Sequence, residues 1–197
     1  MSQRLIGDVK NSPYFFFLTV DIGRLYIYDD LDLLASVKSD ILERNIPQNL
    51  KSPEDKWFAL SKRSRIIVTS KERVKEGQIT KIEDLANEQW KGRVCSRPGS
   101  HVYNRALMAS LILYLGEKAA EEWAKKFVGN LARRPQGNDR AQVKAIFEGQ
   151  CDISIINNYY FGKLKYSDDP SQREWAKSVR LIFPNQGAED RLSLIHI

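Results

Sequence analysis

The chain has 197 residues with 42% hydrophobic and 28% charged side chains, which is enough apolar material for one large domain or two small ones. Its 31 Lys and Arg against 25 Asp and Glu give a net charge of +6, which suits an anionic partner, but no block of five like charges marks a nucleic-acid-binding tail. No apolar run approaches the roughly 18 residues of a membrane helix, and no signal peptide follows Met1. The protein is therefore either cytosolic or without its natural N-terminus.

Apolar periodicity and capping residues predict strands that alternate with helices. Thr80 with Glu83 three residues later forms a capping box, and Ser100 can cap the next helix. Asn138 and Gly149 bound a further helix. In chain order we expect a strand at 15–20, a helix at 21–34, strands at 57–60 and 65–69, a helix at 80–90, a strand at 92–95, helices at 100–115, 117–127 and 138–149, a strand at 152–156, a helix at 169–177 and a strand at 179–183. This alternation predicts an α/β fold with a largely parallel sheet.

Recognisable catalytic motifs are missing from the sequence. With only two His, Ser-His-Asp, Cys-His and His-rich metal arrangements have little support. Neither a Gly-x-Gly-x-x-Gly fingerprint nor a Gly-Lys-Ser/Thr phosphate loop occurs. An enzyme that handles anions through Arg63 and Tyr103 would also need a general base, and none stands out. We therefore expect that the protein is not an enzyme.

Two adjacent tyrosines, Tyr159 and Tyr160, directly follow the predicted strand at 152–156. Ligands of open α/β sheets bind beyond the carboxyl ends of the strands. Both phenols can reach one ligand if the backbone turns sharply there, as at a helix start. The commoner reading of such a pair is packing with hydrogen-bonded hydroxyls.

Two further positions favour an anion. The segment around Ser100 follows a strand and opens a helix, whose free N–H groups and positive end attract negative charge, and Tyr103 lies in that first turn. Arg63 is predicted in a turn between two strands, where its guanidinium can hold a carbonate or carboxylate with two hydrogen bonds. The commoner readings are an ordinary helix cap and a solvated basic turn.

Phenol ligands indicate a particular metal. A tyrosine has an ordinary pKa of about 10, so only a strongly Lewis-acidic cation holds several phenolates at neutral pH. Ferric iron meets this requirement, whereas zinc, calcium and magnesium take other ligand sets. Three phenolates would balance Fe(III), and an anion held by arginine would complete its coordination.

The two cysteines, Cys95 and Cys151, cannot form a zinc site alone. They are as consistent with two small buried residues as with a disulfide. If their strands are neighbours, a disulfide can form in an oxidising compartment, and it requires a Cα separation of about 4.4–6.8 Å.

Five stretches resemble the ferric-iron-binding proteins of bacterial ABC transporters, which are class II periplasmic binding proteins. The likeness extends over about residues 12–187, and the matching stretches are 18–25, 57–68, 90–100, 132–140 and 157–160. The resemblance implies a type II fold with two lobes and mostly parallel sheets, of which this chain is an internal fragment truncated at both ends. The expected parts are a first lobe at 1–70, a second lobe at 71–177, a return toward the first lobe at 178–187 and a doubtful, non-native tail at 188–197.

The resemblance also implies roles for individual residues. Tyr159 and Tyr160 resemble the family's tandem tyrosine ligands, and Tyr103 resembles the third tyrosine of its tyrosine-rich subgroup. Arg63 resembles that subgroup's anion-binding arginine. Val20 stands where the glutamate-using subgroup places a ligand. The three phenol oxygens should therefore meet within a few ångströms.

The implied function is a periplasmic, monomeric receptor that captures Fe(III) with a synergistic anion, expected to be carbonate, and delivers it to an ABC permease. We expect no nucleic-acid partner. The alternative is a receptor of the same fold for a small organic solute of the polyamine or thiamine type. That alternative requires aromatic rings stacked on a cation and carboxylates that face the cleft.

Overall fold

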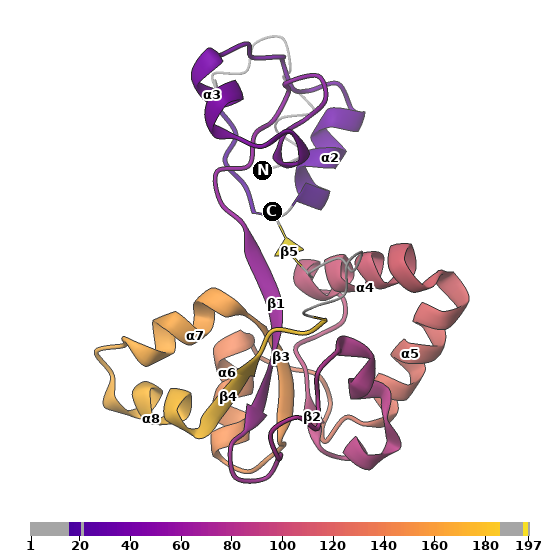
Figure 1. Ribbon diagram of the computed structural model, residues 1–197, viewed down its shortest axis with the longest axis vertical. Coiled ribbons are helices and arrows are strands. Elements are labelled where there is room, and N and C mark those ends of the chain that lie inside the picture. Colours follow the sequence, from indigo (N-terminus) through magenta and orange to yellow (C-terminus); the bar gives the residue numbers. More distant parts are fainter. Residues whose placement is uncertain (1–15, 21, 186–194, 197) are drawn as a thin grey trace. The chain divides into compact units, whose positions relative to one another are not determined.

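The computed structural model describes residues 16–20, 22–185 and 195–196. In it the chain divides into two compact units. The smaller unit comprises residues 1–62 with 196–197, and the larger comprises 63–195 (Figure 1). The division between the two units falls before the strand β1 (Arg63–Ser70), because β1 pairs along most of its length within the larger unit. The lobe boundary that we expected at residue 70 stays a prediction.

The smaller unit holds α2 (Ile22–Asp30), α3 (Asp40–Asn45) and the 3-10 helix Gln48–Leu50. The predicted helix at 21–34 is confirmed in shortened form. The strands predicted at 15–20 and 57–60 are wrong for the residues that the structure describes. A strand needs a hydrogen-bonded neighbour, but Phe16 and Leu18 are 92% and 86% exposed, and Phe58 makes only an isolated bridge.

The larger unit is built on a mixed sheet in the order β2-β3-β1-β4, with β5 (Ile195–His196) beside β1. Its other strands are β2 (Val94–Cys95), β3 (Ile153–Asn157) and β4 (Val179–Ile182). The α/β class is confirmed, but the sheet is not largely parallel. Among the described strands β2, β3, β1 and β4, β2 and β3 pair in parallel, whereas β1 runs opposite to both β3 and β4. β4 pairs with β1, and the return of this segment toward the first lobe stays a prediction.

Alternation along the strands separates two hydrophobic clusters on the two faces of the sheet. Ile67 packs in one cluster with α4 (Val102–Leu115) and α5 (Glu117–Gly129). Ile66 and Val68 pack in the other, with side chains of the helices α6 (Asp139–Phe147), α7 (Asn158–Lys165) and α8 (Pro170–Ser178). Figure 1 shows the two groups of helices on opposite sides of the sheet. None of the described helices is long and apolar enough to cross a membrane.

The helix predicted at 80–90 is wrong: two 3-10 helices, Ile82–Ala86 and Glu88–Trp90, occupy this segment. The Asp84 carboxylate, rather than Thr80, provides the cap, and it accepts from the backbone N–H groups of Thr80 and Lys81. The buried Asn130 amide donates to the carbonyls of Leu85 and Asn87 at 2.9 and 2.8 Å. The amide thereby takes the Leu85 carbonyl, which a continuous helix at 80–90 would use for its own hydrogen bond, and supplies an outside donor to the Asn87 carbonyl in the last turn.

Cys95 at the end of β2 and Cys151 just before β3 are joined by a disulfide with a Cα separation of 5.8 Å. The two strands are neighbours, as the disulfide requires. Because β2 and β3 run in parallel, their carboxyl ends lie at the same edge of the sheet. The bond therefore holds together the two strands from which the candidate site is built.

Candidate metal centre

Tyr103 and Tyr159 meet at this edge of the sheet. Tyr103 lies in the first turn of α4, which follows β2, and Tyr159 lies in the first turn of α7, which follows β3 directly. Their hydroxyl oxygens are 3.3 Å apart. Tyr160 is alongside, with its ring centroid 4.3 Å from that of Tyr159. The sharp turn from strand to helix at Asn157 and Asn158 brings the tandem pair toward Tyr103.

Burial raises the pKa of both central phenols in the metal-free protein. For Tyr103 the loss of solvent is the main cause and the hydrogen bond with Tyr159 adds to it, while the charge of Arg63 opposes it. For Tyr159 the loss of solvent is again the main cause; the hydrogen bond with Tyr103 lowers the pKa and that with Tyr160 raises it. Both phenols are therefore protonated at neutral pH, and a cation must displace their protons to bind.

Three arginines surround the ring of Tyr103. The guanidinium carbons of Arg97, Arg63 and Arg65 lie 5.0, 5.1 and 5.9 Å from the ring centroid. Our prediction that Arg63 lies in a turn is wrong, because Arg63 is the first residue of β1. This end of the strand is held where the Ser64 N–H donates to the Asn158 side chain. Arg65 and Arg97 were not among the predicted site residues, because nothing in the sequence distinguishes them from ordinary surface charges.

Ser100 does not cap α4. The helix begins at Val102, and the His101 side chain caps it by accepting from the Tyr103 backbone N–H at 3.2 Å. The His101 ring also packs edge-on against Tyr103 at 4.6 Å between centroids. An imidazole therefore takes the capping role that we gave to a hydroxyl, and Ser100 is exposed. An anion contact at Ser100 stays a prediction.

A buried polar network lies beneath the tyrosines. Arg65 donates to Asp139 at 3.0 Å and to the side chains of Asn157 and Asn104 at 3.2 and 2.8 Å. Arg97 donates to the other oxygen of Asp139 at 2.7 Å. Burial is the main cause that lowers the pKa of Arg65, and the charge of Asp139 opposes it. The register of β1 against β3, which places Arg65 opposite Asn157, is what brings this network together.

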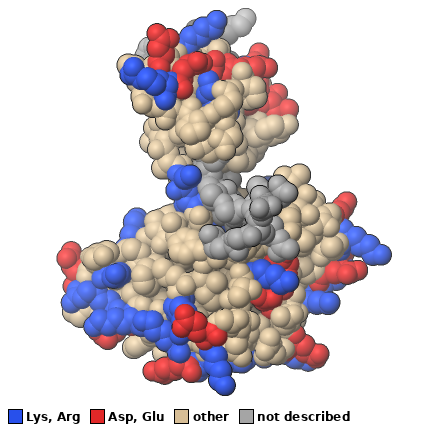
Figure 2. Space-filling view, in the orientation of Figure 1, with Lys and Arg blue, Asp and Glu red and all other residues tan. Residues whose placement is uncertain are grey.

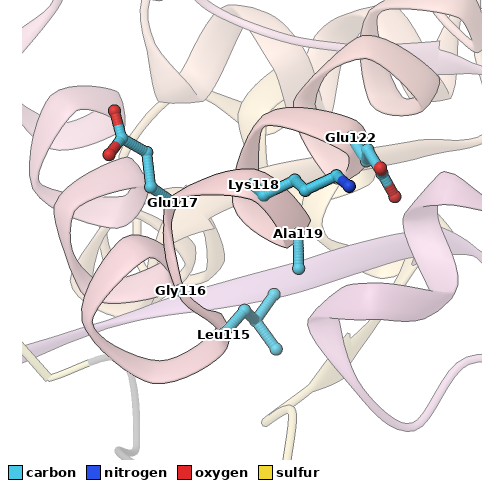
Figure 3. A pocket seen from close by; sticks show the side chains of 6 residues that line it. All are labelled: Leu115, Gly116, Glu117, Lys118, Ala119 and Glu122. Atoms are coloured by element: carbon cyan, nitrogen blue, oxygen red, sulfur yellow. The ribbon is translucent and has the colours of Figure 1, made fainter.

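Other parts of the described surface do not provide a competing centre. No group of three or more His, Cys, Asp and Glu among the described residues is arranged to hold a metal ion. A hollow of about 450 Å³ at the junction of α4 and α5 contains none of the site tyrosines (Figure 3). Basic side chains gather over α7 and α8 (Figure 2). The Nζ of Lys163, a residue of α7, lies 5.6 Å from the Tyr159 ring centroid.

Residues 15–189 match the family described as bacterial extracellular solute-binding protein. The chain belongs to this family. The predicted relationship is thereby confirmed, and this solute-binding protein also matches solved type II structures over nearly its whole length.

The relatives of this solute-binding protein are considerably longer than the chain. Iron uptake proteins A1 and A2 of Synechocystis are 44% and 38% identical to it over 93% and 99% of its length, but the matches cover 51% and 56% of those proteins. The chain thus spans about half the length of these curated relatives. Among solved structures, apo FutA2 from Synechocystis matches 99% of the chain with a TM-score of 0.93 and 38% identity, and the match covers 62% of that structure. A Trichodesmium protein in complex with iron and citrate matches 99% of the chain with a TM-score of 0.92 and 42% identity, covering 61% of that structure.

Proposed function

We propose that this protein captures ferric iron outside the cytoplasm and delivers it to an ABC permease. The observation that carries the proposal is the approach of the Tyr103 and Tyr159 hydroxyl oxygens to 3.3 Å from two different helices, with Tyr160 beside them. The relatives named for iron uptake, and the related structure that contains iron and citrate, support the same cargo.

In this proposal, Tyr103, Tyr159 and Tyr160 supply three phenolates that balance the charge of Fe(III). Each phenol releases its proton when the ion binds. The surrounding guanidinium groups favour the phenolate form and any anion that accompanies the ion. Iron enters as cargo, so the protein only has to bind it, hold it and release it; no chemical conversion is required, and we propose no enzymatic role.

Arginine side chains supply the anion site. Arg63 is half-buried and lies over Tyr103. Arg97 is bound to Asp139 through one nitrogen but leaves its Nε without a hydrogen-bond partner in the described part of the chain. A planar anion such as carbonate fits a guanidinium with two parallel hydrogen bonds. We therefore propose a synergistic anion of the carbonate type at Arg63 and Arg97.

The organic-cation alternative finds less support. It requires carboxylates that are open to a ligand, but Asp139, the carboxylate beneath the tyrosines, is fully buried and paired with Arg65 and Arg97. An excess of arginine around the phenols opposes a cationic organic ligand. A monomeric, periplasmic receptor for an iron–anion pair fits the arrangement better.

The test is titration of the metal-free full chain with Fe(III) in bicarbonate buffer, followed by the visible ferric–tyrosinate charge-transfer band. We expect Tyr103→Phe and Tyr159→Phe to lose most of the band, because each removes a phenolate donor. Tyr166→Phe is the matched control, since this exposed tyrosine follows the same helix α7. A wild-type protein without the band, or a Tyr159→Phe protein with unchanged iron affinity, would contradict the proposal.

The anion is tested separately. Arg63→Ala should weaken iron retention in bicarbonate buffer and have little effect in bicarbonate-free buffer, because it removes a clamp for the anion rather than an iron ligand. Equal affinities of variant and wild type at every bicarbonate concentration would exclude Arg63 from the anion site.

A further inference from the structure

The two tyrosines that meet at the site come from helices that pack in different hydrophobic clusters. Leu107 and Leu111 of α4 belong to the cluster on one face of the sheet, and Leu164 of α7 belongs to the cluster on the other face. Apolar packing therefore holds each helix to the sheet, but does not by itself set the distance between Tyr103 and Tyr159. A contact that joins the two first turns is needed.

Asp139 and Arg65 make this contact. The Asp139 carboxylate is fully buried and accepts from Arg97 through one oxygen. Its other oxygen accepts from Arg65 at 3.0 Å and from the backbone N–H of Asn157 at 2.8 Å. Asn157 is the last residue of β3, two positions before Tyr159. The carboxylate thus fixes the backbone at the start of α7.

The guanidinium of Arg65 reaches the other tyrosine. Its Nη2 donates to the Asn104 side chain at 2.8 Å and to the Ile155 carbonyl at 3.2 Å. Asn104 directly follows Tyr103 and donates in turn to the Arg97 carbonyl at 3.0 Å. One buried ion pair therefore contacts the chain next to each of the two tyrosines.

We propose that Arg65 and Asp139 are a positioning pair that holds Tyr103 and Tyr159 together before iron arrives. The inference rests on the proposed iron-binding function and adds residues that touch neither the ion nor its anion. Ligands that are already in place lose little freedom on binding, and partners that orient metal ligands typically contribute about 10- to 100-fold to affinity. A planar guanidinium with several donors is required, because an ammonium cannot contact all of these acceptors at once.

The experiment compares Asp139→Asn and Arg65→Lys with the control Asp152→Asn in the full chain. Asp152 also joins two arginines in the same unit, but it precedes β3, whereas Asp139 contacts the residue that ends it. We expect Asp139→Asn and Arg65→Lys to bind Fe(III) about 10- to 100-fold more weakly than wild type. Their charge-transfer band should also shift and lose intensity, whereas Asp152→Asn should keep the wild-type band and affinity.

Asn104→Ala tests the inference even if the charge variants do not fold. It removes the hydrogen bond between Arg65 and the half-buried Asn104 side chain, and it leaves the Arg65–Asp139 ion pair in place. We expect a smaller loss of affinity in the same direction, in a protein that still unfolds cooperatively. An unchanged band and affinity in Asn104→Ala, or an equal loss in Asp152→Asn, would overturn the inference.

A structure of each folded variant without metal separates this inference from the proposed function. The positioning role predicts that the Tyr103 and Tyr159 hydroxyls move apart from their 3.3 Å separation. If wild type binds no iron but the hydroxyls separate in the variants, the iron proposal fails and the positioning role stands. If wild type binds iron and the hydroxyls stay in place, the positioning role is refuted.

Discussion

Reduction of the Cys95–Cys151 disulfide should strongly destabilise the larger unit. The bond closes a loop with a sequence separation of 56, and the loop-closure entropy it removes from the unfolded chain corresponds to about 4 kcal/mol at 25 °C. For a unit of this size the loss should lower the melting temperature by on the order of 10 °C. The effect should extend to the proposed iron site, because the bond joins the two strands that lead to Tyr103 and Tyr159.

The assay is urea unfolding of the oxidised and the fully reduced wild-type chain, followed by tryptophan fluorescence. Trp90 and Trp123 report on the larger unit, since both belong to its hydrophobic clusters. Comparing two redox forms of one sequence isolates the cross-link, and a Cys95→Ala/Cys151→Ala variant measures the added cost of the lost side-chain volume. Free energies of unfolding that differ by less than about 1 kcal/mol between oxidised and reduced protein would refute the entropic reasoning.

Three further predictions concern stability. Burial raises the pKa of Asp152, but hydrogen bonds from two arginines outweigh it and lower that pKa. The carboxylate therefore stabilises the fold above a pH of about 4, and this stabilisation is lost as the pH falls through the lowered pKa. In urea unfolding, Asp152→Asn should be less stable than wild type at pH 7, and its stability should depend less on pH below 4. Asn130→Ala should cost about 2–4 kcal/mol in the same assay, because two buried carbonyls lose their donor. Gly137→Ala should cost more than Gly92→Ala in thermal unfolding, because both glycines have a φ of +71° but only at Gly137 does an added Cβ meet a neighbouring side chain, at 2.8 Å.

Each of these predictions has an outcome that contradicts it. The Asp152 reasoning fails if variant and wild type lose stability in parallel below pH 4. For Asn130, a cost below about 0.5 kcal/mol would show that water or a relaxed turn replaces the amide. Equal costs at Gly137 and Gly92 would mean that the backbone conformation matters and the steric contact does not.

Features that depend on residues adjacent in the sequence, such as helix caps, were predictable. Asn138 and Asp169 cap α6 and α8, as their side-chain chemistry indicates. The tandem tyrosines follow a strand, as expected, because an apolar run ends there. The helix α7 that they begin was not among the expected elements, because its short segment has no clear apolar stripe. Such signals act over a few residues, so they survive without knowledge of the fold. The resemblance to a binding-protein family could be identified for the same reason, from contiguous stretches of sequence.

The tertiary structure alone decided which charges belong to the site. Arg65 and Asp139 are separated by 74 residues, and in the sequence each has the appearance of a solvated surface charge. The antiparallel direction of β1, in place of the largely parallel sheet that the sequence predicted, sets Arg65 opposite Asn157 and so brings the two charges together. The same pairing makes Arg63 part of a strand rather than a turn. A buried ion pair is stable when distant elements supply most of its hydrogen-bond partners, and those elements meet only in the folded chain.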